Sequence, residues 1–146
     1  MIIFSDDDFK DAIDDIASHI EIDGWKPDVI IGMVRGGAIP AVYLSHRLKV
    51  PVTMLHISTR DFAVISKEIY QVVVGNRGKN ILFVDDIIDS GHTMQIVLDN
   101  FNYMRYNDTM KIACLIYNKS QPIKADYYHH IIDRDTEQRW IKFPWE

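Results

Sequence analysis

Three segments of this chain are apolar almost without interruption, and they constrain its fold more than any other feature. They are VIIGMV at residues 29–34, ILFV at 81–84 and KIACLIY at 111–117. Neighbouring side chains of a strand point to opposite faces of the sheet, so strands without polar alternation must be covered on both faces. Segments with helical spacing separate these strands. The pattern therefore predicts an α/β fold in which helices flank a parallel β-sheet core.

The first helix has the clearest boundaries. Ser5 is a residue type that caps helix N-termini, and the three acids at 6–8 suit the positive end of the helix dipole. Gly24 ends the element. Apolar residues recur through it at helical spacing, at Phe9, Ile13, Ile16 and Ile20.

The same patterns divide the rest of the chain. The polar run at 59–71 has no clear period and predicts a loop, while Val72–Val74 predicts a short strand. We expect a single domain over residues 1–146, with a core over about 1–120 and a small C-terminal hood over about 121–146. Further helices are expected at 38–48 and 93–105, and further strands at 50–58, 128–133 and 138–142.

Composition narrows the class of protein. With 146 residues, 47% of them apolar, the chain is long enough for one domain with a buried core. A net charge of −5 without a long basic run predicts no nucleic-acid partner and no membrane partner. The start MIIFSDDDFK lacks the features of a signal peptide, and the single Cys114 offers no disulfide framework. These observations predict a cytoplasmic globular protein.

The segment ILFVDDIIDSGHTM, residues 81–94, places carboxylates and a glycine turn directly after an apolar strand. Ligands of parallel sheets bind beyond the carboxyl ends of the strands. Backbone N–H groups at a helix start carry partial positive charge, and glycine permits close approach of a phosphate. The turn Asp89-Ser90-Gly91-His92-Thr93 adds two hydroxyl donors and therefore predicts a phosphate site, although its spacing is not that of a Walker loop.

Asp85 and Asp86 have two interpretations. They can grip adjacent hydroxyls of a sugar or hold Mg²⁺, which usually takes one or two carboxylates plus substrate phosphates and waters. Alternatively, they only solvate the end of a strand while Asp89 caps the following helix. The third acid and the phosphate-type turn favour the first interpretation. The segment then predicts a phosphorylated sugar bound with Mg²⁺.

A second anion site is indicated by Arg35-Gly36-Gly37, which follows the strand at 29–34. The two glycines free backbone amides, and Arg35 adds a positive charge. A plain structural turn is the alternative. Because the polar turns at 35–37, 58–60 and 85–93 all follow strands of one parallel sheet, we expect them to face one pocket.

Residues 81–93 resemble the phosphoribosyl-pyrophosphate signature of type I phosphoribosyltransferases: an apolar strand, two acids, two apolar residues, then Asp, a small residue, Gly, any residue and Thr. The segment at 28–48 resembles the pyrophosphate loop of the xanthine-guanine and hypoxanthine enzymes, and IIDRDTEQRWIKFPWE resembles their C-terminal end. The resemblance implies Mg²⁺-dependent transfer of ribose 5-phosphate from phosphoribosyl pyrophosphate to a 6-oxopurine base in purine salvage. It also implies a homodimer or homotetramer.

The resemblance assigns roles around the sugar. Asp85 and Asp86 would contact the ribose hydroxyls and, directly or through water, Mg²⁺. Residues 89–93 would hold the 5-phosphate. Arg35 and Gly36 would meet the pyrophosphate, in a loop where the family often has a non-proline cis peptide.

For the base, the resemblance implies a second set of contacts. Asp89 would lie near N7 of the purine as the proton acceptor, and Lys119 would reach the 6-oxo group. Trp140 would stack on the base, and the backbone of Ile141 would meet its edge. Ser58 would open the mobile loop that closes over the reaction.

Three positions depart from the family pattern or are variable within it. Thr59 follows Ser58 where the family commonly has tyrosine, and His92 occupies a variable place in the phosphate turn. Lys142 stands where the xanthine-guanine enzymes carry an acid near the purine 2-position. A cation there would weaken a preference for the amino group of guanine, so the preferred purine stays open.

Two other functions remain to be distinguished from this enzyme. One is a non-catalytic relative that binds a nucleotide or phosphoribosyl pyrophosphate as a regulator, although the chain has no basic patch for nucleic acid. The other is a phosphoribosyltransferase for another base, which the Trp140-Ile141 pair disfavours.

Overall fold

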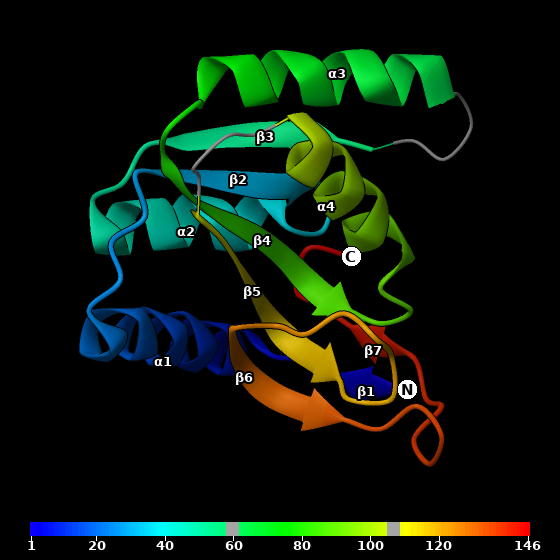
Figure 1. The fold of residues 1–146 in the computed structure, drawn as a ribbon. Coiled ribbons are helices and arrows are strands. Elements are labelled where there is room, and N and C mark those ends of the chain that lie inside the picture. The colour runs from blue at the N-terminus through cyan, green and yellow to red at the C-terminus, as the bar shows by residue number, and fades with distance from the viewer. Residues whose placement is uncertain (58–61, 105–108) are drawn as a thin grey trace.

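The chain is described by a computed structural model over residues 1–57, 62–104 and 109–146, and the side chains of 62–66 and 103–104 lie outside this description. Its centre is a five-stranded sheet in which the strands pair in parallel (Figure 1). The predicted parallel α/β fold is confirmed. In spatial order, the strands are β3 (Val52–His56), β2 (Val29–Val34), β4 (Asn80–Ile88), β5 (Thr109–Asn118) and β6 (Tyr127–Ile132).

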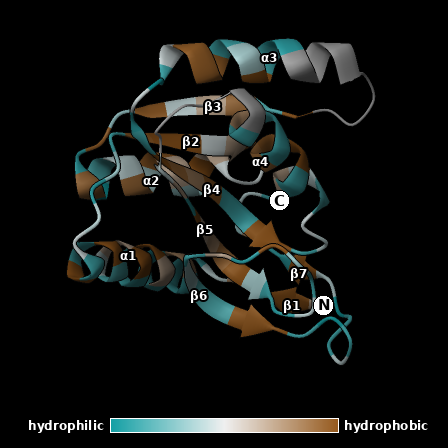
Figure 2. Ribbon diagram, viewed as in Figure 1, coloured by the Kyte–Doolittle hydropathy of each residue, from teal (hydrophilic) through white to brown (hydrophobic). Residues whose placement is uncertain are grey.

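Helices cover both faces of the sheet. α1 (Asp6–Asp23) and α2 (Ala38–Leu48) pack on one face, and α3 (Phe62–Gly75) and α4 (His92–Met104) pack on the other. Figure 2 shows hydrophobic and hydrophilic residues alternating around α1, as expected for a helix with one buried face. None of the helices in the described ranges is long and apolar enough to cross a membrane.

The side chains of the strands divide between two cores by alternation. Ile30, Leu82 and Leu115 belong to the core under α1 and α2, while Ile31 and Phe83 belong to the core under α3 and α4. All five are almost completely buried. This is the two-sided burial that uninterrupted apolar strands require.

α1 begins and ends as its sequence predicts. The hydroxyl of Ser5 accepts a hydrogen bond from the Asp8 backbone N–H at 3.1 Å, and the Asp8 carboxylate accepts one from the Ser5 N–H at 2.8 Å. The Ser5 hydroxyl also donates to the Asp8 carboxylate, at 2.7 Å. The bonds from the Ser5 N–H and hydroxyl lower the pKa of Asp8, because both favour the ionised carboxylate. Gly24 closes the helix in the left-handed conformation, with φ of 74°.

α3 corrects the sequence analysis, which predicted a loop at 59–71 and a short strand at Val72–Val74. Residues 62–75 form one helix, whereas 58–61 lie outside the described residues. The β-branched residues suggested a strand, but Ile69 and Val73 are four positions apart and both are buried against the sheet. Burial of one helix face outweighs the modest intrinsic preference of valine and isoleucine for strands.

The C-terminal hood is built around a two-stranded parallel sheet that the sequence analysis missed. β1 (Ile2–Ile3) pairs with β7 (Ile141–Lys142), so the first residues of the chain hold its last strand. The Ile2 N–H donates to the Trp140 carbonyl at 2.7 Å. β7 is shorter than the strand expected at 138–142. β6, which lies inside the expected hood segment, is instead the edge strand of the main sheet.

Gly32 allows α2 to approach β2 closely. A Cβ atom on Gly32 would lie 2.7 Å from both the Cβ of Ala41 in α2 and the sulfur of Met54 in β3. Methionine can rotate away, but the Ala41 Cβ is fixed to the helix backbone. α2 follows the 35–37 loop directly, so this contact helps set the position of that loop.

We predict that Gly32→Ala lowers the free energy of unfolding by about 1–3 kcal/mol through overpacking. Chemical denaturation measures this difference. Gly75→Ala is the matched control, because a Cβ there would meet no atom of the described residues within 4 Å, so this variant should be neutral or slightly stabilised. Equal stability of the Gly32→Ala variant and the unmodified protein would show that the α2–β2 contact relaxes freely.

Candidate functional site

The predicted site residues gather where the order of strands in the sheet reverses. From β2 the chain passes to β3 on one side, and the next strand, β4, lies on the other side of β2. Such a switch point leaves a crevice at the carboxyl ends of the two strands. The 35–37 loop leaves β2 there, directly beside Asp85 and Asp86 of β4, and the Val34–Arg35 peptide bond in it is cis.

Two glycines are required by this close approach. A Cβ atom on Gly36 would lie 2.3 Å from a carboxylate oxygen of Asp86, and one on Gly37 would lie 2.3 Å from the Val84 carbonyl oxygen. Real side chains do not tolerate such distances. The glycine pair therefore lets the loop backbone lie directly against the acids.

Asp85 and Asp86 lie inside β4 and not at its end, which corrects the predicted strand boundary at Val84. β4 continues to Ile88 because β5 keeps pairing with it, and Asp85 lies opposite Cys114. β2 pairs with β4 only as far as Val84, so beyond that point one edge of β4 is free of the sheet. The acids occupy this free edge.

The two carboxyl groups are held in a polar but poorly solvated place. The Asp86 N–H donates to Asp85 at 2.9 Å, and the Ile87 N–H donates to Asp86 at 2.7 Å. Burial, together with repulsion from Asp86, raises the pKa of Asp85 well above its ordinary value. Burial also raises the pKa of Asp86, and Glu146 adds repulsion. Both carboxylates would be favoured by a nearby cation.

One cavity, of about 520 Å³, opens over the 35–37 loop and the free edge of β4. It brings together four predicted site residues, namely Arg35, Gly36, Asp86 and Trp140 of the hood. Trp145 also lines this cavity. The Trp145 indole lowers the pKa of Asp86, although the indole N–H makes no well-aligned hydrogen bond to any described residue. The remaining lining residues are Ile87 and Glu146.

A second cavity, of about 130 Å³, lies over the turn that starts α4. It is lined by Asp85 and Ile87 to Met94, and Ile87 lines both cavities. The Ser90 hydroxyl accepts a hydrogen bond from the His92 N–H at 3.3 Å, and the first helical bond runs from Gln95 N–H to the Gly91 carbonyl. Backbone amides at this helix start form the type of anion site that the sequence predicts.

Gly91 is required for a reason that the sequence did not indicate. Its φ of 79° lies in the left-handed region, and an added Cβ would lie 2.4 Å from the Gln121 side-chain oxygen and 2.9 Å from Ile123. The turn is thus packed against the segment that follows β5. Glycine here serves the packing of the turn as well as any approach by a phosphate.

Asp89 is bound by an arginine that the sequence analysis did not select. Arg134 Nε lies 2.9 Å from one carboxylate oxygen of Asp89, and Arg134 Nη2 lies 3.2 Å from the other. The side chain of Arg134 is 19% exposed, whereas that of Asp89 is 47% exposed. The guanidinium therefore lies behind the carboxylate and leaves part of it accessible.

Asn118 fixes the backbone around this pair. It is 4% exposed at the end of β5, donates to the Asp89 carbonyl at 2.8 Å and accepts from the Arg134 N–H at 3.1 Å. The next residue, Lys119, is exposed, and its ammonium lies 3.6 Å from Asp133. Lys119 lines neither cavity described above; it follows Asn118, whose side chain binds the Asp89 backbone.

The hood residues differ in what they can offer a ligand. The Trp140 side chain is 66% exposed, whereas the Ile141 side chain is 4% exposed and belongs to the core under α1 and α2. The Ile141 side chain therefore packs in the core, and the contact of its backbone with the edge of a base stays a prediction. Ser58 lies outside the described residues.

Sequence reasoning missed Arg134, Asn118, Ile87 and Trp145 as members of the site. The signal available for Arg134 was weak, since it is one of two arginines in the charged stretch DRDTEQR. Asn118 is a single polar residue closing an apolar strand, directly before the selected Lys119. Neither position can be paired with Asp89 from sequence spacing.

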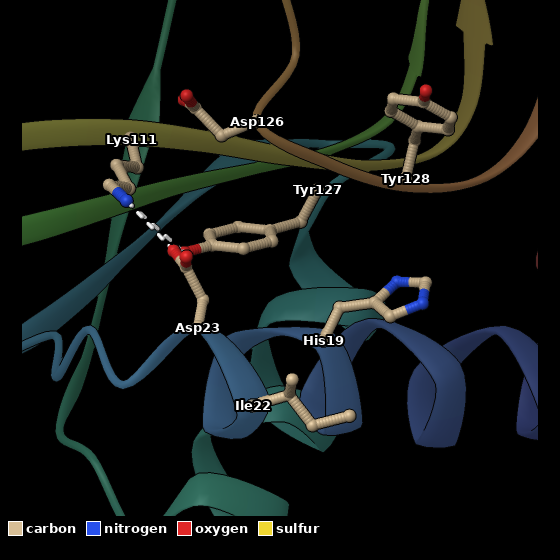
Figure 3. A pocket seen from close by; sticks show the side chains of 7 residues that line it. All are labelled: His19, Ile22, Asp23, Lys111, Asp126, Tyr127 and Tyr128. Atoms are coloured by element: carbon tan, nitrogen blue, oxygen red, sulfur yellow. Dashed lines mark hydrogen bonds and ion pairs between the residues drawn. The ribbon is translucent and has the colours of Figure 1, made fainter.

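A separate cavity of about 590 Å³ lies at the opposite, amino-terminal ends of β5 and β6, beside the end of α1 (Figure 3). Two of its charged groups, Lys111 and Asp23, bind each other. The Lys111 ammonium lies 3.0 Å from Asp23 and 3.3 Å from the Tyr127 hydroxyl, and that hydroxyl donates to Asp23, which lowers the pKa of the Asp23 carboxyl. These bonds join α1 to the edge of the sheet, which is a structural role.

Comparison with known proteins agrees with this geometry. A xanthine-guanine phosphoribosyltransferase from Cereibacter sphaeroides is 28% identical over 136 residues, which cover 86% of this chain and 75% of that protein. A hypoxanthine-guanine phosphoribosyltransferase from Aquifex aeolicus is 26% identical over 148 residues, covering 96% of this chain and 82% of that protein. Among solved structures, a purine phosphoribosyltransferase from Pyrococcus horikoshii superposes with a TM-score of 0.78 at 28% identity, covering 99% of this chain and 93% of that one.

The model of the phosphoribosyl transferase domain family matches residues 3–146, and that match takes in both glycine turns, the acid pair and the hood. The chain therefore belongs to the phosphoribosyl transferase domain family.

Proposed function

We propose that this protein is a purine phosphoribosyltransferase, which transfers ribose 5-phosphate from phosphoribosyl pyrophosphate to a 6-oxopurine and releases pyrophosphate. The observation that carries the proposal is the meeting of Arg35-Gly36, Asp86 and Trp140 around one cavity, with the 89–93 turn beside it. These groups suit, in that order, a pyrophosphate, a sugar, a flat base and a phosphate. The named relatives support the same reaction.

The sugar and its phosphates would be held by backbone and carboxylate groups. The 5-phosphate suits the amides and hydroxyls of residues 89–93, and the pyrophosphate suits the exposed Arg35 with the backbone of the glycine loop. Asp85 and Asp86 accept hydrogen bonds and so suit the ribose hydroxyls. In this placement the reacting carbon lies between the two cavities, so binding of both phosphate groups orients it.

The base would be held between the hood and β4. Trp140 offers an exposed aromatic face, and Ile87 lines both cavities. Asp89 would accept the proton that the purine loses, which makes the attacking nitrogen more nucleophilic. Lys119 would donate to the 6-oxo group and so stabilise the negative charge that this proton loss leaves on the base. Movement of Lys119 away from Asp133 would be needed for that contact.

Mg²⁺ fits the donor set at the acid pair. Asp85 and Asp86 are two carboxylates whose burial and mutual repulsion favour a cation, and Mg²⁺ usually takes one or two carboxylates, substrate phosphates and waters. When bound, the ion would neutralise charge that develops on the departing pyrophosphate. The residues of the chain position the sugar against it.

The finer assignments stay predictions. Lys142 has an exposed side chain on β7, so it can reach solvent beside the base edge, and a cation there disfavours the amino group of guanine relative to xanthine or hypoxanthine. A cytoplasmic location and a homodimer or homotetramer also remain predictions.

The reaction itself is the first test. The protein is incubated with phosphoribosyl pyrophosphate, Mg²⁺ and, separately, xanthine, guanine, hypoxanthine, adenine or a pyrimidine, and pyrophosphate release is measured. We expect release with at least one 6-oxopurine and little with adenine or pyrimidines, because the role proposed for Lys119 requires an oxygen acceptor on the base. No release with any base would overturn the enzyme and favour a binding protein.

Asp89→Asn tests the proton acceptor. The amide keeps the shape of the side chain but cannot take a proton, so kcat should fall about 10²-fold or more while the affinity for phosphoribosyl pyrophosphate changes little. Steady-state kinetics with the preferred base measure both. Asp135→Asn, in the exposed part of the same surface, is the control. Equal losses in turnover and in affinity would contradict the role.

Asp85→Asn tests the electrostatic cost of the acid pair. The pKa of Asp85 is raised in the folded state, so its ionisation destabilises the fold at pH values above its unfolded-state pKa, and this cost is absent where the carboxyl is protonated in both states. At pH 7 without divalent metal, the variant should therefore unfold about 2–4 °C higher.

Thermal unfolding at pH 7 and near pH 3.5 checks this sign. The gain should vanish at the lower pH, and Asp99→Asn, at an exposed site on α4, should show no comparable gain. A lower unfolding temperature for Asp85→Asn at pH 7 would mean that its hydrogen bond from Asp86 outweighs its desolvation.

A further inference from the structure

Two consecutive residues after β6 bind the two side chains that the proposed function assigns to the purine. Arg134 binds the carboxylate of Asp89 with two hydrogen bonds, and Asp133 lies 3.6 Å from the ammonium of Lys119. Each of the two proposed base-binding side chains is thus paired with a residue of opposite charge. Both contacts come from one short loop between the main sheet and the hood.

The two contacts differ in strength. The Asp133–Lys119 pair has a single long contact, and its side chains are 28% and 58% exposed. Exposed pairs of this kind contribute little, because solvent screens them and side-chain entropy opposes them. Arg134 is only 19% exposed and presents two nitrogens to both oxygens of Asp89, the geometry in which arginine binds carboxylates best. Arg134 is therefore the residue that can fix its partner.

The remaining donors of Arg134 bind the hood. Its Nη1 donates to the carbonyl of Arg139 at 2.7 Å and to the carbonyl of Glu137 at 3.2 Å. Arg139 directly precedes Trp140. A single planar guanidinium thus joins the carboxylate of Asp89 to the segment that carries the exposed aromatic ring.

Asn118 completes this unit from the sheet side. It binds the backbone of both Asp89 and Arg134, and its side chain is buried at the end of β5. Neither end of the Arg134–Asp89 pair can move without breaking a hydrogen bond to the core. The backbones of both partners are therefore fixed by a buried residue, although the Asp89 side chain is partly exposed.

We propose that Arg134 is a positioning residue that fixes the Asp89 carboxylate relative to Trp140, so that the proton acceptor and the stacking face meet the same purine. The inference rests on the proposed function. A carboxylate has about four lone-pair sites, and the arginine uses two of them, which leaves sites on the 47% exposed Asp89 side chain for the base. A misplacement of about 1 Å in such a group can cost about 10²-fold in rate.

A double-mutant cycle tests whether Arg134 acts through Asp89. Arg134→Gln removes the fork, and we expect kcat with the preferred 6-oxopurine to fall about 10-fold or more, while KM for phosphoribosyl pyrophosphate changes less than about 3-fold. In the Asp89→Asn background the same substitution should change kcat less than about 2-fold. Arg134→Lys keeps the positive charge without the two-pronged geometry, so its kcat should lie between that of the unmodified protein and that of Arg134→Gln.

Arg47→Gln is the matched control. Arg47 makes a comparable pair with Glu21, at 2.6 Å between α2 and α1, away from both cavities, so its loss should leave turnover unchanged. If Arg134→Gln lowers kcat by the same factor with and without Asp89, it acts on the hood alone and the proposal is overturned. A rise in kcat overturns it too, because the pair would then restrain Asp89 unproductively.

Folding is monitored separately by thermal unfolding. If Arg134→Gln does not fold, the same cycle is run with Arg134→Lys, and equal losses in both backgrounds again overturn the proposal. Absence of turnover by the unmodified protein with every base would instead overturn the proposed function. The two failures are therefore distinguishable.

Discussion

The close contact between the 35–37 loop and the acids of β4 is the constraint on which the rest of the site depends. Gly36 and Gly37 have no side chains because the Asp86 carboxylate and the Val84 carbonyl occupy that space. The contact exists because β2 and β4 are neighbours while the chain departs from them in opposite directions. A parallel sheet with that switch point places an anion-binding loop and a pair of carboxylates together without any further element.

This arrangement has an electrostatic cost, which the proposed ligands would relieve. Burial and repulsion raise the pKa of Asp85 and of Asp86, so the fold disfavours their ionised forms, which a bound cation would favour. Asp89 is treated differently, since Arg134 binds both of its oxygens. Asp85 and Asp86, proposed for the sugar and the metal, would be stabilised by a bound cation, whereas Asp89, proposed for the base, already binds Arg134.

Much of the fold and part of the site could be predicted from the sequence. The uninterrupted strands required a parallel sheet, Ser5 and Gly24 bounded the first helix, and the 81–93 motif located the acids and the phosphate-type turn. The helix at 62–75 could not be predicted from propensity, because its β-branched residues favour a strand. Burial of Ile69 and Val73 on one helix face decides the conformation of this segment. The β1–β7 pairing joins residues about as far apart as the chain allows, so no local pattern indicates it.

The sequence by itself determined the family, the parallel sheet and the order of acids, glycines and hydroxyls in the 81–94 segment, because these depend on residue type and local spacing. Only the tertiary structure decided what those groups contact. It placed Gly91 against Gln121, the first strand of the chain beside the backbone of Trp140, and Arg134 behind Asp89. Such contacts depend on how the connections after β5 and β6 return to the sheet edge. Nothing in the local sequence around Arg134 indicates that its partner is Asp89.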